Sequence, residues 1–109
     1  GDGLDPSFGA GGWDQRPKTH ELSQNYPNPF NPATSIRVSV PDASEVRLRV
    51  YDMTGRLVRT LLTGSTSAGR FTVTWDGMDD TGRPAASGVY FCRMETPGVS
   101  LTRKMMLIK

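Results

Sequence analysis

The chain has few of the residue types on which catalytic and metal sites depend. Its 109 residues include one cysteine, Cys92, and one histidine, His20. One cysteine cannot form an internal disulfide, and one thiol with one imidazole cannot complete a zinc site. We therefore expect a protein that is not an enzyme and that carries no metal and no cofactor.

Long apolar runs and clusters of like charge are also missing. The longest apolar run, Met105–Ile108, is far shorter than the roughly 20 residues that a membrane-spanning helix needs. The net charge is +2, and the basic residues are spread along the chain without interleaved aromatic residues. We expect no membrane span and no nucleic-acid partner.

The most informative segment is a proline-rich corner at positions 27–32, with the sequence Pro-Asn-Pro-Phe-Asn-Pro. Each proline fixes its own φ and disfavours helix at the residue before it. Asn28 and Asn31 favour turns, because their side chains bond nearby backbone groups. This corner leads into residues 34–40, where Ile36, Val38 and Val40 alternate with polar residues and predict a half-buried strand.

The same alternation recurs along the rest of the chain, without helical periodicity and without an internal repeat. It predicts strands at 46–51, 57–62, 71–75, 89–96 and 99–108, with a further one near 21–25 and a polar loop at 63–69. Short strands between Gly and Pro turns indicate an all-β antiparallel sandwich of about seven strands, preceded by an extended N-terminal arm.

The chain divides into two parts by composition. Residues 1–18 are glycine-rich and form either a flexible linker or a docking arm, in which Leu4, Phe8 and Trp13 contact this domain or a neighbouring molecule. Residues 19–109 form the folded domain.

The ordered set of motifs resembles a known family. It begins with Tyr-Pro-Asn-Pro-Phe-Asn-Pro at 26–32, Val-Tyr-Asp at 50–52 and Gly-Arg-Leu-Val at 55–58. It continues with Trp-Asp-Gly at 75–77, Gly-Val-Tyr at 88–90 and Lys-Met-Met-Leu-Ile-Lys at 104–109. Together these motifs resemble the type A C-terminal sorting domain of the type IX (Por) secretion system, a pattern close to the Ig-like domain of the flagellar hook-cap protein FlgD.

The resemblance implies an Ig-like sandwich that serves as a non-catalytic address at the end of a secreted cargo. Its implied partners are secretion-apparatus proteins of the outer membrane. Its implied location is the cell surface or the exterior, reached through the periplasm of a Gram-negative bacterium. No cargo domain precedes this chain, so we expect either an excised tail or a fold reused as a separate subunit.

The final strand is the main candidate site, because apolar residues on both of its faces cannot all enter one core. Either a receptor captures an exposed edge by strand addition or side-chain pockets, or the N-terminal arm covers that edge. The resemblance assigns the shape to two residues and the signal to the last seven. These are Gly88 and Tyr90, then Arg103, Lys104, Met105, Met106, Leu107, Ile108 and Lys109.

Three further groups have a structural and a functional interpretation. Asp76, Asp79 and Asp80 suggest either a calcium loop or a network of turns. Arg37, Arg47 and Arg49 form either an outward ladder that binds anionic polysaccharide or phosphate, or an ordinary solvated face.

Residues 90, 92 and 94 share one face of a strand, and we expect all three in the core. Tyr90 would then bond the backbone at a sandwich corner, and Cys92 would be a buried apolar group and not a nucleophile.

The alternative function is a structural subunit of an extracellular filament or surface layer. In that interpretation the arm at residues 1–18 completes the sheet of a neighbouring copy.

Overall fold

The computed structural model describes residues 17–109, and within this range all regular structure is β-strand. The described residues contain seven strands: β2 (Glu21–Leu22), β3 (Thr34–Val40), β4 (Ser44–Asp52), β5 (Leu57–Thr66), β6 (Gly69–Trp75), β7 (Gly88–Thr96) and β8 (Val99–Leu107). The expected docking residues Leu4, Phe8 and Trp13 lie outside the described residues. In residues 17–109 no helix is long and apolar enough to cross a membrane.

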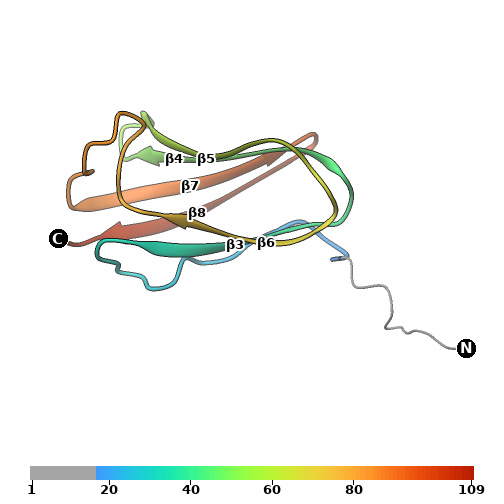
Figure 1. Ribbon diagram of the computed structural model, residues 1–109, viewed down its shortest axis with the longest axis horizontal. Coiled ribbons are helices and arrows are strands. Elements are labelled where there is room, and N and C mark those ends of the chain that lie inside the picture. The colour runs from blue at the N-terminus through green and yellow to red at the C-terminus, as the bar shows by residue number, and fades with distance from the viewer. Residues whose placement is uncertain (1–16) are drawn as a thin grey trace, which may run out of the picture.

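The strands form two antiparallel sheets that pack face to face (Figure 1). One sheet has three strands in the order β2-β3-β6, and the other has four in the order β5-β4-β7-β8. The chain passes from one sheet to the other after β3, after β5 and after β6. The expected Ig-like sandwich of about seven strands is confirmed.

The core comes from the alternating apolar residues of both sheets. In β4, Val46, Leu48 and Val50 are fully buried, while the residues between them face outward. The ring of Trp75 lies at the centre of the core, 5.4 Å from the Phe30 ring and 5.3 Å from the Tyr90 ring between centroids. Its indole nitrogen donates a hydrogen bond to the Met78 carbonyl oxygen at 2.9 Å. Burial of each such side chain contributes about 1.5–3 kcal/mol, which makes this cluster a major source of stability.

Two loops repeat one five-residue motif, Asp-x-Thr-Gly-Arg, at 52–56 and 79–83. Oδ1 of Asp52 accepts hydrogen bonds from the Thr54 amide, the Thr54 hydroxyl and the Arg56 amide at 2.7–3.0 Å. Asp79 makes the same three bonds to Thr81 and Arg83. The glycines have φ of 85° and 86°, a conformation that disfavours a side chain. The two turns therefore share one hydrogen-bonding pattern, which the sequence analysis did not identify.

Some strand boundaries differ from the predicted ones. Strand β5 continues to Thr66, through the segment predicted as a polar loop, because Ser65 and Thr66 pair with β4. Strand β2 ends at Leu22, since the Asn25 side chain turns inward and donates to the Pro27 carbonyl and the Thr34 hydroxyl. In both places long-range pairing or a buried polar contact overrides local composition.

Of the two interpretations of Arg37, Arg47 and Arg49, the continuous outward ladder is wrong. Arg37 lies in β3, and Arg47 and Arg49 lie in β4, so the two groups belong to different sheets. Outward-facing residues of opposite layers point away from each other. They therefore cannot form one binding strip.

Candidate functional site at the final strand

Strand β8 places its residues alternately in the core and on the outer face. Met105 is fully buried and Leu107 is 2% exposed, so both belong to the core. Met106 is 40% exposed, Ile108 is 49% exposed, and Lys104 is also exposed. The resemblance assigned the signal to residues 103–109, but a partner cannot contact Met105 or Leu107, because the core buries both side chains. Removal of either side chain would leave a cavity in the core.

The free edge of β8 is covered over its carboxyl-terminal half by the proline-rich corner. The Phe30 amide donates to the Met106 carbonyl oxygen, and the Ile108 amide donates to the Phe30 carbonyl oxygen, both at 3.0 Å. The Met106 amide donates to Asn28 Oδ1 at 3.0 Å. This half of β8 is thus not the open edge that we expected, since its backbone groups already have partners. The described cover comes from residues 24–30. The arm that the alternative interpretation invoked lies almost entirely outside the described residues.

Two side chains fasten the middle of β8 to the segment before the corner. Arg103 Nε donates to the Leu22 carbonyl oxygen at 2.7 Å, and Gln24 Nε2 donates to the Lys104 carbonyl oxygen at 2.7 Å. Arg103 therefore joins the edges of the two sheets. Its position supports a structural role in addition to the signalling role implied by the resemblance.

The exposed residues of β8 continue an apolar surface across the outer face of the four-stranded sheet. The register places Met106 beside Val89, and it aligns Lys104, Phe91, Tyr51 and Leu57 in one row across the four strands. We call Leu57, Tyr51, Phe91, Val89 and Met106 the outer patch. Contiguous exposed apolar surface of this kind is typical of interaction sites.

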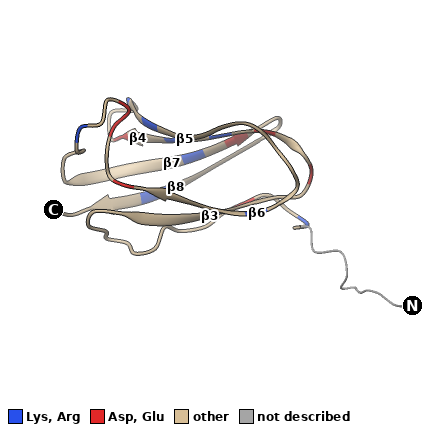
Figure 2. Cartoon of the chain, viewed as in Figure 1, with Lys and Arg blue, Asp and Glu red and all other residues tan. Residues whose placement is uncertain are grey.

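Basic side chains border the outer patch. The guanidinium carbons of Arg49 and Arg93 lie 5.9 Å and 5.1 Å from the centre of the Tyr51 ring. Arg49 also forms an ion pair with Glu95, with 2.8 Å between Nη2 and Oε1. This hydrogen bond is the main reason that the pKa of Glu95 is lowered and that of Arg49 is raised. In Figure 2, basic positions on β7 and β8 lie in the same sheet as this patch, while acidic positions lie mainly towards the loops.

Gly88 and Tyr90 hold the shape at the start of β7. The Tyr90 hydroxyl donates to the Ala86 carbonyl oxygen at 2.6 Å, which confirms the expected corner bond. Burial is the main reason that the pKa of Tyr90 is raised. Gly88 has φ of 155°, a conformation that L side chains rarely adopt.

The aspartates of the loop between β6 and β7 accept backbone hydrogen bonds. Oδ1 of Asp76 accepts from the Met78 amide, and Oδ1 of Asp80 accepts from the Thr60 amide. Within residues 17–109 no group of three or more His, Cys, Asp or Glu side chains is placed to hold a metal ion. The turn-network interpretation explains the hydrogen bonds that these carboxylates make.

Cys92 and Met94 are fully buried, as expected, and Tyr90 is buried beside them. Burial raises the pKa of the Cys92 thiol to about 12, so the thiol is protonated at neutral pH. This is the environment of a structural cysteine and not of a nucleophile.

A model of the FlgD Ig-like domain matches residues 28–98 of this chain. The chain belongs to the FlgD Ig-like domain family. The matched segment begins inside the proline-rich corner and ends in the turn between β7 and β8. No curated protein matches the chain.

Solved structures share the fold of this FlgD Ig-like domain. FlgD from P. aeruginosa is 26% identical with a TM-score of 0.53, and the match covers 69% of this chain and 60% of that one. Dimeric latent PorU from Porphyromonas gingivalis is 24% identical with a TM-score of 0.63, and the match covers 84% of this chain and 9% of PorU. PorZ from the same organism, a surface component of the type IX secretion system, is 24% identical with a TM-score of 0.54, over 81% of this chain and 11% of PorZ. The chain therefore spans less than two thirds of each of these proteins.

The sequence interpretation missed most of the outer patch. Its signal was nevertheless present, because Tyr51, Val89 and Phe91 occupy the outward positions of two strands whose inward residues were identified. An apolar residue at an outward position is informative only when its neighbours across the sheet are also known.

Proposed function

We propose that this FlgD Ig-like domain is a non-catalytic sorting domain for the type IX secretion system. Its folded surface would be recognised by secretion-apparatus proteins of the outer membrane. It would direct an attached cargo to the cell surface or the exterior through the periplasm. The motif resemblance supports this proposal, and so does the fold that the domain shares with PorU and PorZ.

The observation that carries the proposal is that some side chains of the last six residues are buried and others are exposed. Met105 and Leu107 are buried and maintain the sandwich, while Met106, a member of the outer patch, and Ile108 are exposed. Lys104 and Lys109 add positive charge at the same end of the domain. A receptor that binds this surface would recognise only folded domains, because the outer patch is assembled from four strands.

The decisive experiment uses point variants on the outer face and avoids truncation. Deletion of residues 104–109 would remove two core side chains, so a loss of export could reflect unfolding. We would fuse a passive reporter ahead of the full chain and replace Met106→Asp together with Ile108→Asp. The matched control is Thr74→Asp, an exposed position on the outer face of β6 in the opposite sheet, outside both the outer patch and the last six residues.

We expect the double variant to stay in the periplasm and the control to reach the surface. Thermal unfolding of both purified chains checks that the fold is intact. Equal surface delivery of the two variants would contradict the proposal.

A further inference from the structure

The amino-terminal half of β8 presents backbone groups at the same sheet edge that the proline-rich corner covers further along. The pairing of β8 with β7 has no register shift from Val99 to Leu107. In a regular antiparallel pair, every second residue directs both its N–H and its C=O to the outer edge. Met106 and Ile108 do so, since they bond Phe30. Ser100, Thr102 and Lys104 follow the same alternation.

The outward backbone groups of Ser100, Thr102 and Lys104 differ from those of Met106, whose N–H and C=O both have partners. No described residue forms a hydrogen bond with the backbone of Ser100 or Thr102 on this edge, and Lys104 uses only its carbonyl. A row of unpaired N–H and C=O groups is a template for another strand. The free stretch is short, and the contact between Arg103 and Leu22 closes one end of it.

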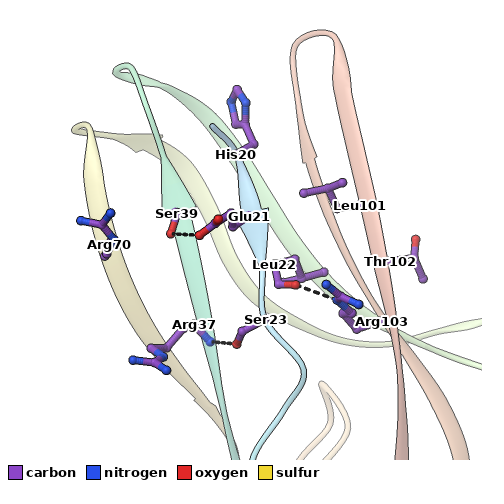
Figure 3. Close-up of a pocket in the computed structure, with 10 residues that line it drawn as sticks. All are labelled: His20, Glu21, Leu22, Ser23, Arg37, Ser39, Arg70, Leu101, Thr102 and Arg103. Atoms are coloured by element: carbon purple, nitrogen blue, oxygen red, sulfur yellow. Dashed lines mark hydrogen bonds between the residues drawn. The ribbon is translucent and has the colours of Figure 1, made fainter. Parts of the chain in front are cut away.

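A groove of about 700 Å³ lies beside this free stretch at Thr102, and Leu101, Thr102 and Arg103 line it from β8 (Figure 3). Leu22 on the β2 side and Leu101 on the β8 side provide apolar walls, and His20 lies near its upper end in this view. An extended backbone in the groove would therefore meet hydrogen-bonding groups on β8 and apolar side chains on both sides.

The charges of the residues that line the groove indicate the charge of the ligand that it binds. Arg37 and Arg103 line the groove, and Glu21 is the only acidic residue among the lining residues described. The Glu21 carboxylate accepts a hydrogen bond from the Ser39 hydroxyl at 3.3 Å. The surroundings are thus basic, which favours an acidic ligand.

We propose that this groove receives an extended acidic segment of a partner protein, which adds to β8 as a strand at Ser100–Thr102. Backbone hydrogen bonds would supply affinity, and alternating apolar and acidic side chains would supply specificity. The proposal rests on the proposed function for the source of the partner, the secretion apparatus. It differs from the outer patch, which lies on a face and not at an edge.

The test uses the full-length, isotopically labelled chain and a synthetic eight-residue peptide of alternating Val and Asp. We expect saturable binding with chemical-shift changes centred on the amides of Ser100, Thr102 and Lys104. A peptide with Lys in place of Asp, and one with N-methylated central residues, should bind at least about tenfold more weakly. Equal binding of the three peptides, or shift changes confined to the outer patch, would overturn the proposal.

Variants of Thr102 separate backbone pairing from side-chain contact. Thr102→Pro removes an edge N–H that β7 does not use, and an edge strand tolerates such a proline. Thr102→Ala keeps the N–H. We expect only the proline variant to lose at least about tenfold in affinity. Because proline can disturb the strand, the N-methylated peptide provides the same test on an unaltered protein.

The segment before Pro17 is the competing occupant. If the acidic peptide binds only when Leu4, Phe8 and Trp13 are all replaced by serine, the chain's own arm fills the groove and the partner proposal is wrong. Peptide binding is measured on purified protein and export in cells, so the failure of one proposal is distinguishable from the failure of the other.

Discussion

The two halves of β8 share one strand and one sheet edge, yet the fold treats them differently. From Lys104 to Ile108, hydrogen bonds from residues 24–30 reach the edge, and Met105 and Leu107 fill the core. From Val99 to Thr102, the described residues leave the edge unpaired beside a basic groove. The cover lies over the half whose inward side chains are buried, whereas Val99 and Leu101 in the other half are only partly buried. A natural sandwich that protects only part of an edge keeps the remainder available for pairing.

The comparison also separates stability from recognition. The carboxyl-terminal half resembles a signal in sequence, but two of its side chains, Met105 and Leu107, belong to the core. The amino-terminal half has polar residues, Ser100 and Thr102, at its edge positions. It differs from the other half because no described residue pairs with its edge. Recognition as proposed above would therefore depend on the surfaces of β8 more than on its linear sequence.

The strongest challenge to the comparison is a pair of methionine variants in the covered half. Met105→Ala should reduce the free energy of unfolding by about 2–5 kcal/mol, because it leaves a cavity in a closely packed core. Met106→Ala should cost less than about 1 kcal/mol, since this side chain is partly solvated. Urea unfolding of both variants measures the difference. Similar losses would show that the inward and outward assignments of β8 are wrong.

Amide hydrogen exchange compares the two halves directly in the unmodified protein. The amides of Met106 and Ile108 have acceptors in the corner, so they should exchange on the order of 100-fold more slowly than those of Ser100 and Thr102. All four point to the same edge. Equal protection would mean that an additional segment covers the amino-terminal half.

Tyr90→Phe tests the support beneath the start of β7. The variant keeps the ring against Trp75 but loses the hydroxyl that donates to the Ala86 carbonyl. We expect a loss of about 0.5–1.5 kcal/mol in the free energy of unfolding, measured by urea titration. Phe91→Tyr adds a hydroxyl on the outer face and should have little effect. If Tyr90→Phe is also neutral, the corner bond does not contribute to stability.

The smallest expected effect concerns the two Asp-x-Thr-Gly-Arg turns, which are far from the β8 edge. Hydrogen bonds from the Thr54 and Thr81 hydroxyls are the main reason that the pKa values of Asp52 and Asp79 are lowered from 3.8. Their contribution to stability is therefore present above pH 3.8 and is lost as pH falls through the folded pKa.

The midpoint temperature of thermal unfolding, measured from pH 6 to pH 2, should fall less steeply for Asp79→Asn than for the parent chain. Asp42→Asn is the control, as Asp42 accepts no hydrogen bond in the described structure. An unchanged slope in the Asp79 variant would show that the turns do not contribute to the loss of stability at low pH.

Much of the sandwich was predictable because its signals are local. The alternation at 36–40 and 46–50 identified inward faces, and the expected roles of Tyr90, Cys92 and Met94 were correct. The arginine ladder failed because alternation identifies an outward face without indicating which sheet carries it. The predicted end of β5 was too early, because the polar residues Ser65 and Thr66 are held in the strand by their partner strand β4.

The sequence by itself determined which segments are extended, which side chains seek the core, and where proline forbids helix, since each depends on a few neighbouring residues. Only the tertiary structure decided that residues 24–30 lie along the carboxyl-terminal half of β8 and stop short of Ser100 and Thr102. Contacts between segments some 80 positions apart leave no periodic trace in either segment. They follow from how two twisted sheets close over one core.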